Sequence, residues 1–491
     1  MKKILLSLGI LLLVVALVVV TRTLMHTPQS PQPGADTVTV EVPLDADIVA
    51  QHLSEAIRFP TVSHQRASDF EPEVFEDFIQ WVENTYPEVN QAMQRERPGL
   101  YSLLYRWQGR NAALKPILIT GHYDVVPVIP GTEALWEQPP FAGNIIDGVI
   151  WGRGALDDKS AVIAQLEAAT LLLKQGYQPE RTVYFSFGHD EEIGGSEGAA
   201  SVTRSLQQQG VQLAWSLDEG SFLFKGMLPG VEPLMAAVNV AEKGSVTLNI
   251  VAKAAGGHSS MPPKQTAVGI LAEAITRLEQ HPIPGGLTGL SGQMFDTASR
   301  YMPFSYRMLF ANRWLFDSVI DEQLSSLPFG NAMLRTTTAP TMLSASVKVN
   351  VLPIKAVATV NFRIHPRDTV QGVFDYVKSV VENDHVEVQL PAGSGRPASR
   401  ISDWQSEGYG VIERGIRDIY GDVVVTPGLM IAGSDSRHYG QIADNAFRFN
   451  PMMVTSGDLT GFHGTNEKIS VDNLAQGTRT YARIIQLGSA K

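Results

Sequence analysis

The sequence has no cysteine in its 491 residues, and this absence restricts its chemistry. Without cysteine there are no disulfides, no thiolate zinc ligands, no iron–sulfur clusters and no cysteine nucleophile. Any metal ion must therefore be bound by histidine and carboxylate side chains. Blocks rich in lysine and arginine are also absent, and 39 basic against 50 acidic residues leave a net charge of −11. This balance argues against a phosphate-backbone partner, so we expect no binding to nucleic acid.

Glycine, proline and charge are not in excess, which excludes two further classes of protein. The chain has 43 Gly, 29 Pro and 18% charged residues against 44% hydrophobic residues. These values fit neither a fibrous repeat nor a globally disordered chain. At roughly 150 residues per domain, the length predicts two or three globular domains.

The N-terminus carries the one long hydrophobic run, Ile4–Val20, which follows Lys2 and Lys3. Its length falls between a secretory signal core and a full membrane span of about 20 residues. No small-x-small cleavage site follows Val20, so we interpret residues 1–23 as an uncleaved signal anchor; a cleaved signal peptide is the alternative.

The charges around this run predict its orientation. The lysines should stay in the cytoplasm, which exports the rest of the chain to a periplasmic, extracellular or lumenal location. If the signal is cleaved, the protein is secreted instead. Residues 24–43 are proline-rich and are interpreted as a semi-rigid stalk.

From Leu44 onward, strand and helix patterns alternate. We expect strand Pro116–Thr120, helix Ser160–Lys174, strand Thr182–Phe187, a helix near Ser196–Gln208 and strand Gln212–Leu217. This rhythm predicts an α/β fold with a mostly parallel, doubly wound sheet.

A change of pattern near Lys243 predicts an inserted smaller α+β domain over residues 243–366. Its expected elements are strand Ser245–Ala252, helix Thr266–Gln280 and strands Ala345–Val351 and Val357–Ile364. The sheet domain then consists of residues 44–242 and 367–491. The interval 285–345 shows no clear periodicity, but residues 304–316 are rich in aromatic and aliphatic side chains. Two interpretations stay open for that stretch: packing in a domain core or dimer interface, or a groove for a long acyl chain.

Acidic residues and histidines follow several predicted strands. His122 and Asp124, the run His189–Glu192, and Asp218–Glu219 each stand at a strand end, where ligands bind in open α/β sheets. Asp157 and Asp158 open a helix, and His463 lies between late elements. Taken singly, each is explained by a satisfied polar residue, a solvated loop or a helix cap.

Taken together, these residues predict a metal centre. His122, Asp157, Glu192, Asp218 and His463 exceed what one tetrahedral ion requires, so two metals bridged by a carboxylate fit better. Asp124 can accept the second ring N–H of His122, and Glu191 is adjacent to a ligand but free to act as a base.

The motifs also have a recognisable order: GHYDVVP, GRGALDDK, GHDEEIGG, LDEG, GGHSSMPP, FRIHP, GSDSR and HGTNEKIS. From Leu44 to the C-terminus the chain resembles the dinuclear zinc exopeptidase family of aminoacylase, carnosinase and glutamate carboxypeptidase. Within that family it is most similar to the branch of Gly-X carboxypeptidase and N-fatty-acyl-amino-acid hydrolase/synthase.

The resemblance implies a role for each matching residue. It implies one zinc on His122, Asp157 and Asp218 and another on Asp157, Glu192 and His463, with Co²⁺ or Mn²⁺ as substitutes. Asp124 orients the first histidine and Glu191 is the general base. The remaining implied contacts to the substrate come from His258 of a lid and dimerisation domain, often across a homodimer interface, and from Arg363, Gly433, Ser434 and Asp435. The choice of Asp218 over its neighbour Glu219 depends on the resemblance alone, and AGSDSRHY departs from the Gly-Gly-Thr-Asp of many relatives.

The function expected is therefore a zinc-dependent metallohydrolase of carboxypeptidase or aminoacylase type. It would cleave the amide bond of dipeptides or N-acyl amino acids and release a C-terminal amino acid. The alternatives are an N-fatty-acyl-amino-acid hydrolase/synthase specifically, a non-catalytic zinc- or peptide-binding protein, or a dinuclear phosphoesterase.

Overall fold

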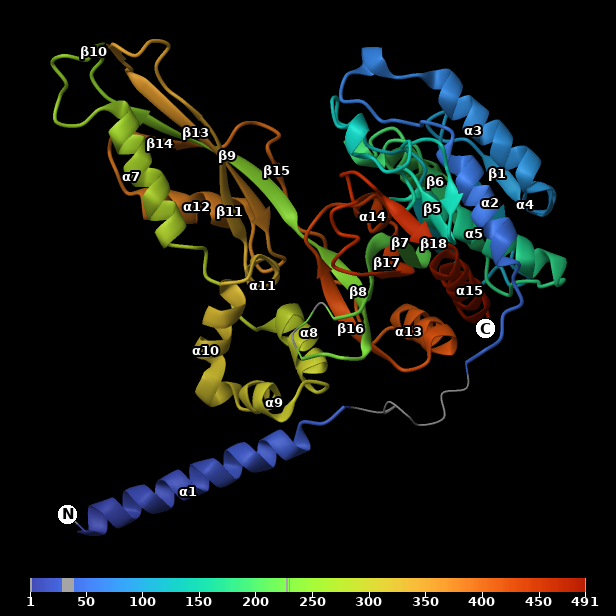
Figure 1. Ribbon diagram of the computed structural model, residues 1–491, viewed down its shortest axis with the longest axis horizontal. Coiled ribbons are helices and arrows are strands. Elements are labelled where there is room, and N and C mark those ends of the chain that lie inside the picture. The colour runs from blue at the N-terminus through green and yellow to red at the C-terminus, as the bar shows by residue number, and fades with distance from the viewer. Residues whose placement is uncertain (1, 29–38, 227, 229, 491) are drawn as a thin grey trace.

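The computed structural model describes residues 2–28, 39–226, 228 and 230–490. Figure 1 shows two sheet-containing units and a long N-terminal helix beside them. The larger unit contains an eight-stranded sheet in the order β1-β2-β6-β3-β7-β17-β8-β16. Its strands are β1 (Gln94–Glu96), β2 (Leu103–Trp107), β3 (Ile117–His122), β6 (Val183–Gly188), β7 (Leu213–Phe224), β8 (Leu234–Glu242), β16 (Val423–Met430) and β17 (Ala443–Val454).

The central pairs of this sheet are parallel, which confirms the predicted fold class. Strands β6, β3, β7 and β17 run parallel to one another, and β8 runs parallel to β16. The pairs β1–β2, β2–β6 and β17–β8 are antiparallel. The sheet is thus mixed but mainly parallel.

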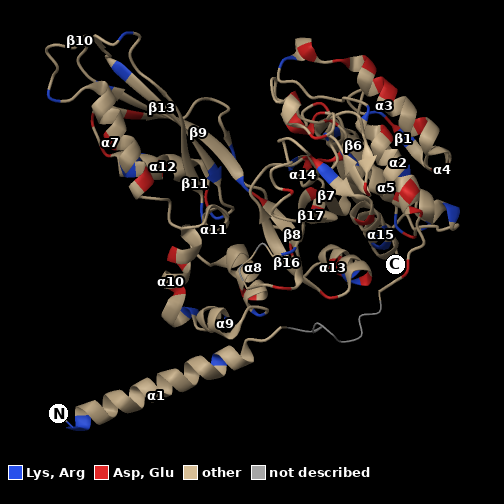
Figure 2. Ribbon diagram, viewed as in Figure 1, with Lys and Arg blue, Asp and Glu red and all other residues tan. Residues whose placement is uncertain are grey.

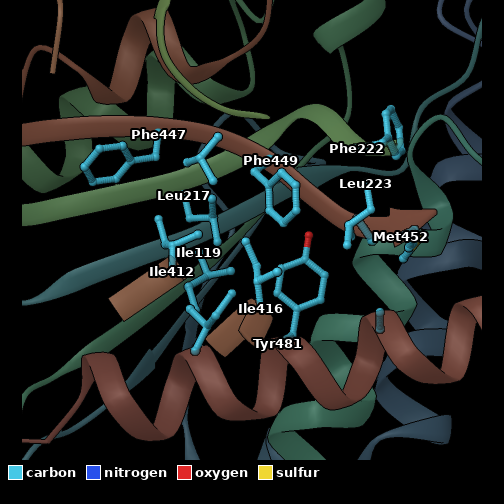
Figure 3. Close-up of a cluster of buried hydrophobic side chains, with 14 of the residues drawn as sticks. Ile119, Leu217, Phe222, Leu223, Ile412, Ile416, Phe447, Phe449, Met452 and Tyr481 are labelled. Atoms are coloured by element: carbon cyan, nitrogen blue, oxygen red, sulfur yellow. The ribbon is translucent and has the colours of Figure 1, made fainter. Parts of the chain in front are cut away.

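Helices cover both faces of the sheet, as a doubly wound fold requires. On β3, Ile117 and Ile119 belong to the main core, whereas Leu118 between them belongs to a smaller core on the other face. The main core packs against α2 (Ala46–Ile57), α5 (Lys159–Lys174), α13 (Glu407–Tyr420) and α15 (Val471–Gly488). Figure 3 shows Ile412 and Ile416 of α13 and Tyr481 of α15 against the strand residues Leu217 and Phe449.

Short elements complete the larger unit. They are α3 (Pro72–Thr85), α4 (Pro87–Ala92), α6 (Ala199–Gln208), α14 (Ser436–Tyr439) and a small sheet of β18 (Lys468–Ser470), β5 (Val149–Trp151) and β4 (Ile145–Ile146). Asp45 caps the first helix of this unit, α2, by accepting hydrogen bonds from the amides of Asp47 and Ile48.

The smaller unit is an antiparallel sheet with its own core. Its strands follow the order β11 (Thr337–Ser344), β13 (Lys355–Ile364), β9 (Gly244–Lys253) and β14 (Val386–Gln389), and β15 (Gly395–Arg396) also pairs with β9. Helices α7 (Ala267–Gln280) and α12 (Val370–Val381) supply its other core residues. Because Val373, Val377 and Val381 of α12 pack there, this unit extends past the predicted boundary at residue 366.

One strand predicted for this unit is wrong. Instead of Ala345–Val351, the edge strand is β11, and Val347 and Val349 are each 99% exposed in a turn beyond the sheet. Pro340 lies within β11, where the register shifts, and an edge strand tolerates proline because its outer N–H groups need no partner. The alternation of valines in 345–351 therefore marks a hairpin tip, next to the short pair β10 (Gly257–His258) and β12 (Val351–Leu352).

The interval that showed no periodicity contains four helices. They are α8 (Gly289–Ser299), α9 (Phe304–Ala311), α10 (Arg313–Ser325) and α11 (Pro328–Leu334). Leu290, Met294 and Phe295 of α8 pack into the core of the larger unit, although the chain reaches them through the smaller one. The aromatic stretch divides accordingly: Phe310 is buried in that core, whereas Phe304 and Trp314 are exposed.

The N-terminal helix α1 (Lys2–Met25) is long and apolar enough to cross a membrane. Figure 2 shows basic residues only near its two ends, and none between Lys3 and Arg22. Half of the predicted stalk, residues 29–38, lies outside the described part of the chain.

Candidate active site

Three neighbouring parallel strands bring the polar residues together. Strand β3 lies between β6 and β7, so their carboxyl ends meet at one edge of the sheet. His122 ends β3, the loop with Glu191 and Glu192 follows β6, and Glu219 lies in β7. The geometry follows the rule that ligands bind beyond the carboxyl ends of the strands.

Asp157 lies between the two imidazoles of this cluster. Its Oδ1 is 3.2 Å from Nε2 of His122, and its Oδ2 is 3.2 Å from Nε2 of His463. The same His463 nitrogen is 3.3 Å from Oε2 of Glu192. Ligands bound at about 2.0–2.1 Å to a tetrahedral ion lie about 3.3–3.4 Å apart, so these separations suit one shared carboxylate between two cations.

Two groups of side chains among the described residues have the spacing of a metal site, and they share His122. One consists of His122, Asp157 and Glu192, and the other of His122, Asp158 and Glu219. Asp158 is fully buried and already accepts 2.8 Å and 3.3 Å hydrogen bonds from Asn450 Nδ2 and the His122 amide. Glu219 has no such competing partner among its hydrogen bonds, so its carboxylate is the better placed to bind a cation.

The structure places Glu219, and not the predicted Asp218, beside His122. Oε2 of Glu219 is 3.6 Å from Nε2 of His122, whereas Asp218 is in neither metal-spaced group. Successive residues of a strand point to opposite faces, so only one of the two can face the cluster. Asp218 is fully buried on the other side, and its Oδ2 accepts no hydrogen bond within the described chain.

Asp124 contacts both His122 and the loop that carries Glu191. Nδ1 of His122 lies 3.0 Å from the Asp124 backbone oxygen and 3.3 Å from its Oδ1. The Asp124 carboxylate also accepts hydrogen bonds from the amides of Glu191 and Glu192 and from Oγ of Ser63. It therefore fixes the ring and the loop together, as expected from a residue that orients a metal-binding histidine.

The charge of the cluster is strongly negative, which suits cations. Burial raises the pKa of Glu191 well above its usual range, and the neighbouring Glu219 raises it further. Burial likewise raises the pKa of Glu219 to about 8. Oε1 of Glu192 is buried without a hydrogen-bond partner among the described residues. Burial disfavours the charged form of these carboxylates. Together with the two imidazoles they form the nitrogen and oxygen donor set that zinc accepts.

Sequence reasoning missed the residues that hold the Asp157 loop in place. Oε1 of Glu467 accepts hydrogen bonds from the backbone amides of Gly154, Leu156 and Asp157, and its Oε2 accepts a 2.8 Å bond from Arg153. Both side chains are buried. The two residues lie in the motifs GRGALDDK and HGTNEKIS, but nothing in those letters indicates that the motifs meet.

The loop Gly433–Asp435 lies close to several guanidinium groups. A side chain at position 433 would come within 3.2 Å of Arg396 Nη2 and 3.3 Å of Arg437 Nη1, so both groups converge on Gly433. Ser434 and Asp435 are buried, and Arg363 is exposed on β13 opposite Ser245. Arg396 and Arg437 were not predicted, although Arg437 belongs to the motif GSDSR.

The structure does not bring His258 to this cluster within one chain. His258 lies in β10 at the far end of the smaller unit (Figure 1), where it is exposed and its Nδ1 is 2.7 Å from Oγ of Ser260.

Known proteins are similar to this chain in sequence over most of its length. The sequence model of peptidase family M20/M25/M40 matches residues 118–487. The chain is 37% identical over 484 residues to a probable carboxypeptidase S-like 2 of Dictyostelium discoideum, covering 97% of this chain and 92% of that protein. It is 39% identical over 443 residues to the mouse N-fatty-acyl-amino acid synthase/hydrolase PM20D1, covering 89% and 87%.

Solved structures share the fold. An M20 family metallo-carboxypeptidase from Sulfolobus solfataricus matches 90% of this chain and 99% of its own, with a TM-score of 0.62 and 18% identity. Human carnosine dipeptidase 1 matches 90% and 96%, with a TM-score of 0.59 and 16% identity. At such identities the likeness concerns the fold.

Proposed function

The chain belongs to peptidase family M20/M25/M40 and is a metal-dependent hydrolase of that family. From this premise we propose that it hydrolyses the amide bond of N-acyl amino acids or dipeptides and releases the C-terminal amino acid. The observation that carries the proposal is Asp157, whose two oxygens each face an imidazole in a cluster with a separate carboxylate, Glu191.

The residues present suit two zinc ions. His122, Asp157 and Glu219 would hold one, and Asp157, Glu192 and His463 would hold the other. Bound there, the ions would supply positive charge that polarises the scissile carbonyl and acidifies a water molecule. Co²⁺ or Mn²⁺, which accept the same ligands, are the expected substitutes.

Glu191 is the residue that moves the proton in this proposal. Its backbone is fixed through Asp124, while its side chain is not required as a ligand. The carboxylate would take a proton from the attacking water and deliver it to the nitrogen of the leaving amino acid.

The substrate carboxylate would bind beside the loop Gly433–Asp435. Arg396 and Arg437 converge on Gly433 of this loop. Burial lowers the pKa of Arg396, Glu242 raises it, and repulsion from Arg437 and Arg363 lowers it further. Guanidinium groups bind carboxylates in a fork geometry, which would select substrates with a free C-terminus. A dinuclear phosphoesterase needs no such separate carboxylate site.

We also propose a homodimer in which the smaller unit contributes His258 to the partner's site. The exposed edge strand β11 and helix α7 form an apolar groove of about 410 Å³, lined by Leu271, Ile275 and Leu343 among others. Met342 and Leu343 are 67% and 68% exposed, and an uncovered apolar edge strand favours pairing with a second copy. His258 projects from the same unit, away from its own metal cluster.

The N-terminal helix would anchor the enzyme to a membrane with the hydrolase on the exported side. Its apolar length and the position of Lys2 and Lys3 support this orientation.

Substrate release assays with the zinc-loaded protein test the proposed function. We expect free amino acid from N-acyl amino acids and dipeptides, and no phosphate from phosphomonoesters. Glu191→Gln should bind the same amount of metal but lose at least about 10²-fold in kcat, the scale of acid–base catalysis. A series of N-acyl substrates from acetyl to dodecanoyl distinguishes a hydrolase of N-fatty-acyl amino acids from a carboxypeptidase of dipeptides. Activity should rise with chain length only in the first case, because each buried methylene adds about 0.8 kcal/mol of binding.

Two outcomes would contradict the proposal. Metal-loaded protein that releases no amino acid from the whole series would indicate a binding protein. Near-normal turnover of Glu191→Gln would remove Glu191 from the mechanism.

A further inference from the structure

The C-terminal end of helix α1 packs against the helices α8–α10. We call this contact the α1 seat. Along α1, Val19 and Thr23 are buried, and they lie four residues apart on one face of the helix. Val15, one turn before Val19, is half-buried, and the rest of the apolar run is exposed. The seat is therefore confined to the C-terminal half of the helix, and Figure 1 shows this end passing beside α9.

Polar contacts fix this seat. Nδ2 of Asn312, between α9 and α10, donates to the Val19 carbonyl at 3.1 Å and lies 3.2 Å from Oγ1 of Thr23. Arg22 Nε donates to the Ala311 carbonyl at 3.0 Å. Just past the helix, His26 Nε2 is 2.9 Å from Oγ of Ser299. Buried hydrogen bonds of this kind specify one docked geometry, so helix α1 and the first residues of the stalk are joined to the enzyme.

The seat coincides with the level at which α1 would leave a bilayer. A hydrocarbon core about 30 Å thick takes about 20 helical residues, and counting from Lys2 and Lys3 this ends near Arg22. Asn312 and the adjoining turns of α9 and α10 contact α1 at Val19–Thr23. They would therefore lie at the outer interface, where the headgroups begin.

Those same turns expose aromatic and apolar side chains. Phe304 and Tyr306 of α9 are each 45% exposed, and Trp314 and Leu315 at the start of α10 are 56% and 46% exposed. The Trp314 Nε1 lies 3.4 Å from Oδ1 of Asn312, which ties this surface to the α1 seat. Tryptophan and tyrosine are enriched at membrane–water interfaces because their rings suit the headgroup level.

We propose that this face, formed by Phe304, Tyr306, Trp314 and Leu315, lies in the outer interface of the lipid bilayer that α1 spans. The inference rests on the proposed membrane anchor and adds a second contact with the lipid. The contact is driven by burial of apolar surface. The nearby Arg300 and Arg313 are paired within their own helices with Asp296 and Asp317, so no anionic headgroup is required.

The absence of cysteine makes this face directly testable in the full-length protein. Single cysteines at Phe304→Cys and Trp314→Cys are labelled with a nitroxide, and the protein is placed in phosphatidylcholine nanodiscs. Leu12→Cys reports on the anchor, and Leu100→Cys, which is 69% exposed in the larger unit, is the matched aqueous control. Electron paramagnetic resonance then compares collisions with oxygen, which concentrates in lipid, and with a water-soluble nickel chelate.

We expect oxygen to dominate at positions 12, 304 and 314 and the nickel chelate to dominate at position 100. Lipid contact at 12 together with the aqueous pattern at 304 and 314 would overturn this proposal and leave the anchor in place. The aqueous pattern at all four positions would overturn both. Low collision with both reagents at 304 and 314, with dipolar broadening between labels, would assign the face to a second copy of the chain and also overturn the proposal.

Discussion

At the scale of single residues, the direction of a side chain determines its role in the site. Asp218 and Glu219 are adjacent carboxylates on β7, yet only Glu219 lies near His122. The strand pleat sends its neighbour to the opposite face, where Asp218 is enclosed on β7 alongside Arg448 of β17. Chemically similar residues one position apart therefore have different expected consequences when they are replaced.

Replacing each of the two tests this assignment. Glu219→Ala should lower the bound metal per chain, measured by mass spectrometry of metals after dialysis, because one cation loses a ligand. Asp218→Asn should retain the metal. Burial raises the pKa of Asp218 to about 6, and a neutral amide of similar shape avoids the cost of burying a charge there. The reverse pattern, with metal lost in Asp218→Asn alone, would restore Asp218 as the ligand.

At the scale of elements, the site depends on a loop that another loop holds in place. The Asp157 loop precedes α5, and Glu467 precedes β18, so residues some 310 positions apart share three backbone hydrogen bonds through one carboxylate. The Arg153–Glu467 pair is buried. Its removal should affect both folding stability and the position of the bridging carboxylate.

Glu467→Gln should therefore be strongly destabilising. Removing one partner of a buried ion pair costs about 3–5 kcal/mol, because the remaining charge is left unpaired. The matched control is Glu273→Gln, which breaks the exposed pair with Arg277 in α7 and should cost only about 0.3–0.5 kcal/mol. Urea unfolding measures both. Equal midpoints for the two variants would show that Glu467 does not support the loop.

At the scale of the whole molecule, the cluster around Asp157 lies in the larger unit, whereas His258 lies in the smaller one. Strand β8 of the large sheet continues into β9 of the small sheet through Lys243, which is buried and donates from Nζ to the Arg335 carbonyl at 2.8 Å. His258 is at the opposite end of the small sheet from this connection. The proposed homodimer would let His258 act on the partner's metal cluster.

Mixed dimers test that arrangement. His258→Ala and Glu191→Gln chains should each be inactive alone, but a heterodimer of the two contains one site with both native residues. We expect activity to return on mixing, measured as released amino acid from an N-acyl substrate. Mixing His258→Ala with a chain that carries both substitutions is the control and should recover nothing. Verified heterodimers that stay inactive would contradict a shared site.

The sequence by itself determined the class of fold and most of the residues that meet around Asp157. Alternating strand and helix patterns predict a mainly parallel sheet, and the absence of cysteine leaves histidine and carboxylate as the available ligands. Because the carboxyl ends of parallel strands meet at one edge, His122 and Glu192 could be placed together without coordinates. The apolar run of α1 was equally evident, because it depends on composition alone.

Only the tertiary structure decided what depends on contacts between distant segments. The choice of Glu219 over Asp218 depends on which face of β7 meets the cluster, and the role of Glu467 depends on two loops meeting across the chain. The helices α8–α11 escaped prediction because their apolar residues divide between the main core, the α1 seat and an exposed face, so no single periodicity marks them. Local sequence specifies the pattern of a segment, but its packing partner decides which side of that pattern is buried.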